Sequence, residues 1–185
     1  MVILHCGSVQ QCVVWMDALR SSGFVLLPNP CIVTYKQSAL SRKGWFRRCR
    51  QCVAHHFWVI AYKGKKPTYN ASSLGITKGF ATCTHFPDMP AVPPRYRLVD
   101  KEGEPMRLCE KSVLEYIEIL TLYSDPSKTV CDFCSGTGAS GLAALMLNHA
   151  HWIGNDRDPR VQQLSMARLK KRTSLTRIRS EIGRA

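Results

Sequence analysis

The sequence is poor in acidic residues and has no long apolar segment. It has 13 Asp and Glu against 26 Lys and Arg, so its formal net charge is +13 and its pI is about 9.6. Such an excess favours a polyanionic partner, most often nucleic acid, although solvated surface charge is the simpler explanation unless the cations cluster. No apolar run approaches membrane-spanning length, and residues 1–15 lack the basic start and cleavage site of a secretory signal. We therefore expect an intracellular protein, nuclear or cytoplasmic, with no membrane partner.

The cysteines lack the spacing of a disulfide scaffold. There are nine of them, an odd number, which favours reduced thiols. Residues 49–56 have the spacing Cys-x-x-Cys-x-x-His-His, which must be considered as a zinc site. A remote pair to close the site is only weakly available at Cys83 and His85, and the neighbouring apolar run can bury Cys52 and His56 without a metal. We therefore predict no metal site.

Strand-like and helical segments alternate along the chain. Hydrophobic residues make up 45% and charged residues 21% of 185, which suits one globular domain with an ordinary core. Apolar patterning predicts strands at residues 2–5, 24–27, 31–35, 55–62, 129–131 and 151–154, and helices at 8–20, 112–122, 139–148 and 158–171. Residues 69–96 contain several Pro and Gly and predict a long surface connection. The alternation predicts the α/β class.

Residues 36–50 interleave cations with aromatic side chains. Cations can contact phosphates and aromatic faces can stack on bases, so this run is a candidate nucleic-acid surface. A solvated loop with its aromatics in the core is the alternative. The candidate contact residues are Lys36, Arg42, Lys43, Trp45, Arg47 and Arg48. The basic segment 170–185 predicts a frayed tail, with a phosphate-contacting arm as the alternative.

In residues 129–158 the spacing of residues indicates a ligand-binding site. A short strand at 129–131 stops at a run of small residues, and the helix at 139–148 starts with its N-terminus pointing at that turn. A second strand at 151–154 leads to Asp156. This order predicts a β-α-β unit whose glycine turn brings bare N–H groups up to a ligand.

The turn matches the dinucleotide pattern G-x-G-x-x-G literally, at residues 136–141. Asp156 follows about 20 residues later, where such units hold ribose hydroxyls. Asp132 argues against a dinucleotide, because a carboxylate just before the turn would repel a pyrophosphate. S-adenosylmethionine has an ammonium, a sulfonium and a ribose but no phosphate, so it suits an acid at each strand end better. The alternative is a glycine turn that is only a turn.

Three segments occur in an order that resembles a known enzyme family. They are Lys111-Ser112 at a helix start, VCDFCSGTGASGLAAL, and HWIGNDRDPRVQQLSMARL. The order resembles that of the amino-group DNA methyltransferases, which modify adenine or cytosine on the exocyclic nitrogen. More narrowly, it resembles the permuted class in which the cofactor half follows the catalytic half. The resemblance covers most of the chain and is specific between Asp132 and Asp158.

The resemblance implies a doubly wound, Rossmann-like methyltransferase sheet in a single α/β domain, incomplete if the chain is a fragment. It implies S-adenosylmethionine as the cofactor, with Asp156 on the ribose hydroxyls and Lys111 where the family has a lysine before its cofactor-side helix. The remaining cofactor residues are then Asp132, Cys134, Ser135, Gly136, Thr137 and Gly138. The chain departs from the family where Phe133-Cys134 replaces Pro-Phe, Ser112 replaces Pro and Thr137 replaces Ser.

The chain lacks the family's catalytic tetrapeptide, which is Asp, Asn or Ser followed by Pro-Pro and an aromatic residue. In the family this motif accepts hydrogen bonds from the target amino group and stacks on the flipped base. Residues 29–31 lack the second proline and the aromatic, and residues 93–96 lack the leading polar residue. Catalytic residues are therefore not identified, and we expect a fragment, a mis-started gene product or a non-catalytic partner.

We divide the chain into a methyltransferase-like domain, residues 1–172, and a basic tail, 173–185. Within the domain, residues 1–66 hold the catalytic-side strands and basic loop, 67–107 the long connection, and 108–172 the cofactor-binding half. We predict an S-adenosylmethionine-dependent methyltransferase, or a fragment of one, that acts on the exocyclic amino group of a base in DNA, with RNA as the alternative substrate. The rival function is a catalytically inactive nucleic-acid-binding or scaffolding subunit, which implies a separate catalytic partner subunit.

Overall fold

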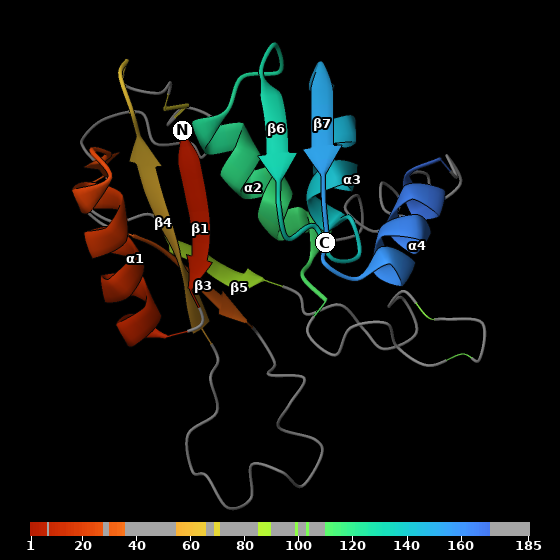
Figure 1. Ribbon diagram of the computed structural model, residues 1–185, viewed down its shortest axis with the longest axis horizontal. Helices are drawn as coiled ribbons and strands as arrows, with labels where there is room; N and C mark the ends of the chain where they lie inside the picture. Colours follow the sequence, from red (N-terminus) through yellow and green to blue (C-terminus); the bar gives the residue numbers. More distant parts are fainter. Residues whose placement is uncertain are drawn as a thin grey trace, which may run out of the picture. The chain divides into compact units, whose positions relative to one another are not determined.

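The computed structural model describes residues 1–6, 8–27, 30–35, 55–65, 69–70, 85–89, 99, 103 and 110–170. Its contacts divide the chain into two compact units, Met1–Ala91 and Val92–Ala185 (Figure 1). Both contain helices and strands, which confirms the predicted mixed α/β class. No helix within the described ranges is both long and apolar enough to cross a membrane.

The first unit is a sheet with one helix. Its elements are β1 (Val2–Cys6), α1 (Val9–Ser21), β2 (Val25–Leu26), β3 (Cys31–Tyr35), β4 (His55–Tyr62) and β5 (His85–Met89). The strand order is β1-β4-β3-β5, and β2 also pairs with β4. β4, which the apolar run predicted as a strand, therefore lies inside the sheet and pairs antiparallel with β1, β2 and β3.

Helix α1 begins where the sequence predicted, because the Ser8 side chain accepts a hydrogen bond from the Gln11 N–H at 3.2 Å. Alternate residues of β1 and β4 form a core cluster with the helix that includes Cys6, Cys12 and Val59. Burial raises the pKa of the Cys6 thiol to about 11, so this cysteine is a protonated core residue at neutral pH.

Strand β5 corrects the expectation that residues 69–96 are an unbroken connection. It pairs parallel with β3, with an irregularity in register between Val33 and Tyr35. The segment contains Pro87, which cannot donate to a ladder and which in a sequence usually indicates irregular chain. An edge strand tolerates proline, and β5 is at the end of the strand order.

The second unit contains the predicted β-α-β unit. Its elements are α2 (Val113–Tyr123), β6 (Thr129–Asp132), α3 (Ala139–Met146), β7 (His151–Gly154) and α4 (Pro159–Lys170). β6 and β7 pair in parallel, with Thr129 opposite His151 and Asp132 opposite Gly154. Both strands therefore end at the same edge, where the chain turns first into α3 and later into α4.

The helix boundaries follow the predicted signals closely. Ser112 caps α2 by accepting a hydrogen bond from the Leu114 N–H at 3.3 Å, and Pro159 is the first residue of α4. Helix α3 ends at Met146, two residues earlier than predicted, and Asn148 then turns the chain with a φ of 57°. Within α3, Leu142 is fully buried in a core cluster.

The packing of α3 gives a matched pair of leucines. Leu142 is 0% exposed and Leu145 is 47% exposed on the same helix. We predict that Leu142→Ala lowers the free energy of unfolding by about 2–5 kcal/mol, because it removes buried methyl groups and leaves a cavity. Leu145→Ala, which makes the same chemical change, should cost about 1 kcal/mol or less. Urea unfolding measures both; equal losses would contradict the placement of α3.

Candidate functional site

The chain between β6 and α3 is a tight glycine turn. Gly136 has a φ of 50° and Gly138 a φ of 77°, backbone conformations that side chains other than glycine rarely adopt. The Gly138 N–H donates to the Ser135 carbonyl at 2.8 Å, and the Gly138 carbonyl then accepts from the Leu142 N–H at 3.0 Å. Gly138 therefore closes the turn and starts the helix.

Gly138 is also required by its neighbour on α4. A Cβ atom at this position would lie 3.0 Å from the Cβ atom of Ser165, which is closer than nearly all real contacts. At Gly136 the nearest atom to such a Cβ would be the Cys134 carbonyl oxygen at 3.9 Å. The turn therefore packs against α4 at Gly138, where a side chain would not fit. At Gly136 there is room for a side chain, and only the positive φ favours glycine.

Asp132 ends β6 with its carboxylate half-buried and held by two donors. One oxygen accepts the Cys134 N–H at 3.0 Å, and the other accepts the Ser140 hydroxyl at 2.5 Å. Ser140 comes from the first turn of α3. The helix and the turn therefore fix the direction of this carboxylate between them.

Asp156 follows β7 and is linked to the same turn. One carboxylate oxygen accepts the Gly136 N–H at 2.9 Å, and the other accepts the Asp158 N–H at 2.9 Å. The backbone extends the strand pairing beyond the ladder, because the Asn155 N–H donates to the Asp132 carbonyl at 2.9 Å. The Ser135 N–H in turn donates to the Asn155 carbonyl at 2.8 Å. The two acids therefore lie at the ends of adjacent parallel strands, tied to one glycine turn.

An ion pair missed by the sequence analysis holds the turn from α4. Arg168 donates to a Glu110 carboxylate oxygen at 2.7 Å and to the Thr137 carbonyl at 3.1 Å. The side chains of Arg168 and Glu110 are 14% and 0% exposed, respectively. A signal was present: Val161, Ser165 and Arg168 share one helical face, and Val161 and Ser165 are both buried. A cation on such a face indicates a buried partner.

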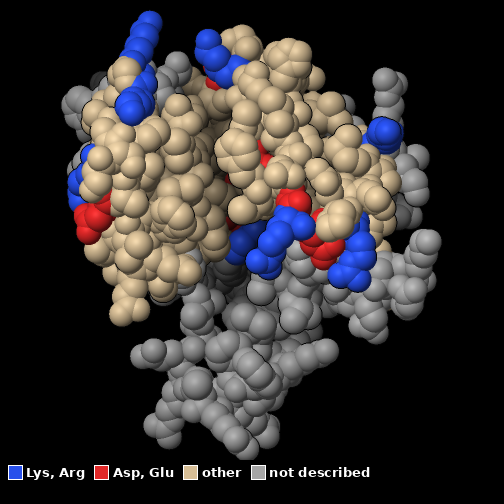
Figure 2. Space-filling model, viewed as in Figure 1, with Lys and Arg blue, Asp and Glu red and all other residues tan. Residues whose placement is uncertain are grey.

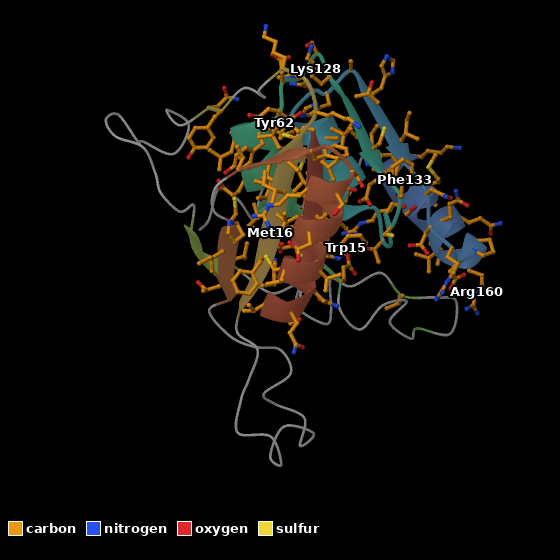
Figure 3. All side chains as sticks on the ribbon, turned by 60° about the vertical axis from the view of Figure 1, so that its left-hand side comes forward. Trp15, Met16, Tyr62, Lys128, Phe133 and Arg160 are labelled. Carbon is orange, nitrogen blue, oxygen red and sulfur yellow. The ribbon has the colours of Figure 1, made fainter. Side chains whose placement is uncertain are left out.

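The environment of Asp132 also includes α2. Burial raises the pKa of Tyr116, and the negative charge of Asp132 raises it further, so the phenol stays protonated. Phe133, the next residue after Asp132, is 76% exposed and is labelled in Figure 3. A large apolar ring in solvent beside a buried turn is a candidate ligand contact.

The structure brings together most of the predicted cofactor residues. Asp132, Ser135, Gly136, Thr137 and Gly138 form the turn with Asp156, and Cys134 is exposed within it. Lys111 is half-buried next to Glu110, whose ion pair reaches the turn through Arg168.

The predicted nucleic-acid residues and the cysteines considered for zinc lie outside the described residues. These are Lys36, Arg42, Lys43, Trp45, Arg47 and Arg48, together with Cys49, Cys52 and Cys83. On the face drawn in Figure 2, the described Lys and Arg side chains are scattered and several stand next to Asp or Glu. Most of the 26 cations fall in segments outside the described ranges, so the clustering predicted for residues 36–50 stays a prediction.

Solved structures show what fold this is. M1.HpyAVI in complex with SAM matches 91% of this chain and 73% of its own, at 20% identity and a TM-score of 0.69. The cytosine-N4-specific PvuII DNA methyltransferase matches 87% and 57%, at 15% identity and a TM-score of 0.62. TTHA0409 of Thermus thermophilus, complexed with S-adenosyl-L-methionine, matches 94% and 69%, at 14% identity and a TM-score of 0.59.

No protein-family model matches the sequence, and no curated protein sequence matches it either. The structural matches show that the chain has the methyltransferase fold, which confirms the predicted fold. Because all three identities are low, the likeness extends to architecture only.

The Arg168 ion pair predicts a large stability difference between two arginines of α4. Arg168→Met should lower the free energy of unfolding by about 3–5 kcal/mol, because it removes the cation from a fully buried carboxylate. Arg160→Met should cost about 0–1 kcal/mol, because the Arg160 side chain is 82% exposed and pairs with Asp158 at the surface. Both variants keep a long unbranched side chain. Thermal or urea unfolding that ranks them equally would contradict the buried pair.

Proposed function

We propose that this chain binds S-adenosylmethionine at the turn between β6 and α3 and serves the methylation of an exocyclic amino group of a base in DNA. One observation carries the proposal: Asp132 and Asp156 end two adjacent parallel strands and are joined through one glycine turn. Support comes from the fold, since two of the matching structures are named as complexes with this cofactor and a third as a DNA methyltransferase.

The residues of the turn suit the chemistry of this cofactor. The Asp132 carboxylate is the partner for its ammonium group, and Asp156 is the acceptor for its ribose hydroxyls. Each oxygen of Asp156 accepts one backbone N–H, which fixes the direction of the carboxylate. Gly136 and Gly138 allow close backbone approach, with Cys134, Ser135, Thr137 and Lys111 around them. A dinucleotide fits less well, because the Asp132 carboxylate would repel its pyrophosphate.

A bound S-adenosylmethionine would supply an electrophilic methyl group on sulfur for in-line transfer to the amine nitrogen of a base, with S-adenosylhomocysteine and a proton as the other products. The protein then acts mainly by positioning the reactants, because holding the reacting atoms in line supplies a large part of the rate acceleration of such a transfer. Asp132 and Asp156 anchor the amino-acid part and the ribose of the ligand, while Arg168 keeps the turn in place by holding the Thr137 carbonyl.

DNA is the proposed polyanion. The formal charge of +13 favours one, and residues 36–50 combine cations with aromatic rings, the pairing that phosphates and unstacked bases require. Extruding a base into an active site would also expose it to stacking on such rings.

A second function follows from the missing Pro-Pro-aromatic tetrapeptide. A chain that binds the cofactor and DNA but lacks the group that polarises the target amine would act as a nucleic-acid-binding or scaffolding subunit beside a catalytic partner. Transfer of labelled methyl from S-adenosylmethionine to DNA by the purified chain alone would rule out this second function. No transfer by a chain that binds both would favour it.

The cofactor proposal predicts the behaviour of the second acid. Calorimetric titration with S-adenosylmethionine should show binding by the wild-type chain and a loss of about tenfold or more with Asp156→Ala, which removes a charged acceptor. Asp17→Ala is the control, because this acid is 67% exposed on α1 and pairs with Arg20 at the surface. A folded wild-type chain that binds no S-adenosylmethionine would overturn the proposal, as would equal losses in both variants.

The DNA proposal predicts a salt dependence that maps to the basic run. The double variant Arg47→Ala and Arg48→Ala should weaken duplex binding and make the slope of log K against log salt shallower by about 1 for each phosphate that is no longer neutralised. The control replaces Arg20 and Lys65, two exposed cations outside the run, and so changes net charge equally. Equal slopes for the two double variants would mean that DNA binding depends on net charge alone, and would contradict a DNA-binding surface at residues 36–50. Repeating the titration with RNA of the same sequence separates the two substrates.

A further inference from the structure

The indole of Trp152 occupies a slot made by two glycines. Its residue lies in β7, and the ring packs against the core cluster beside α3. A Cβ atom on Gly141 of α3 would come within 2.9 Å of Cε2 of this ring. A Cβ atom on Gly154 would come within 1.9 Å of Cη2. Gly141 is the last glycine of the G-x-G-x-x-G pattern, so in this chain that glycine makes room for an indole.

The slot aims the indole N–H at Ser140. Nε1 of Trp152 donates to the Ser140 hydroxyl oxygen at 3.3 Å. An indole N–H can only donate, so the hydroxyl oxygen accepts there and is left with one hydrogen to give. That hydrogen goes to Asp132, whose carboxylate oxygen lies 2.5 Å away. Ser140 is 3% exposed, so water does not compete for these bonds.

The donors to Asp132 are neutral. They are the Ser140 hydroxyl and the Cys134 N–H, and within the described residues no cation forms an ion pair with this carboxylate. A carboxylate whose two oxygens are held by two donors keeps its orientation. Its remaining lone pairs are then available to a cationic group from outside the protein.

We infer that Ser140 is a positioning residue, held by Trp152, which orients the Asp132 carboxylate to take the ammonium group of the amino-acid part of the cofactor. This inference rests on the proposed function and adds to it that these residues make the site selective for ligands with an amino-acid group. Asp132 makes the contact, Ser140 acts through it, and Trp152 fixes the direction of the hydroxyl.

The experiment compares two ligands on the full chain by calorimetry. One is S-adenosylmethionine, and the other is 5′-methylthioadenosine, which has the adenosine and sulfur but no amino-acid group. Ser140→Ala should weaken S-adenosylmethionine binding about tenfold or more, as expected when a hydrogen bond to a charged group is removed. It should leave the affinity for 5′-methylthioadenosine within about twofold. Trp152→Phe should weaken S-adenosylmethionine binding in the same selective way.

Ser165→Ala is the matched control. Ser165 is 1% exposed, lies against the same turn, and donates its hydroxyl to the Gln162 carbonyl rather than to Asp132. It should change neither affinity, and Ser140→Thr, which restores the hydroxyl, should recover S-adenosylmethionine binding. Equal losses in the two serine-to-alanine variants, or an equal loss for both ligands in Ser140→Ala, would overturn the inference. A wild-type chain that fails to bind S-adenosylmethionine would instead overturn the proposed function.

Discussion

The parallel pairing of β6 with β7 is the constraint on which the candidate site depends. Two parallel strands joined by a helix end at the same edge, so residues far apart in sequence meet there. The hydrogen bond from the Asn155 N–H to the Asp132 carbonyl, at 2.9 Å, continues this pairing past the last ladder residues. Asp132 and Asp156 are therefore placed by backbone geometry, before any side-chain contact is made. The bond from the Gly136 N–H to Asp156 then closes the turn between them.

The turn itself is held from two elements, α3 and α4. Ser140 on α3 fixes Asp132, and Arg168 on α4 holds the Thr137 carbonyl. The Cβ and backbone atoms of Ser165 on α4 also lie in the space that a side chain at Gly138 would need. A binding loop requires such contacts, because a carboxylate that moves freely must be ordered when the ligand binds, and this ordering costs free energy. Close packing also explains why glycines recur here: Gly138 meets α4, whereas Gly141 meets the indole of β7.

Local sequence patterns predicted most helices and strands of the second unit but few of the contacts that hold the glycine turn. The strand at His151–Gly154 and the starts of α2 and α4 followed from apolar runs and capping residues, which act over a few positions. The bond from Arg168 to Glu110 joins residues 58 apart, and no local pattern specifies such a partner. Strand β5 was missed because Pro87 is a breaker inside a sheet and is tolerated at an edge, which only the strand order reveals.

The central claim is that S-adenosylmethionine binds between the ends of β6 and β7, and the most direct test locates the ligand on a ¹⁵N-labelled chain by NMR. The account predicts that the largest amide shifts on adding S-adenosylmethionine fall at Gly136, Gly138 and residues 155–158, while amides of α1 stay unchanged. Shifts confined to other parts of the chain, or the same shifts on adding NAD, would contradict it.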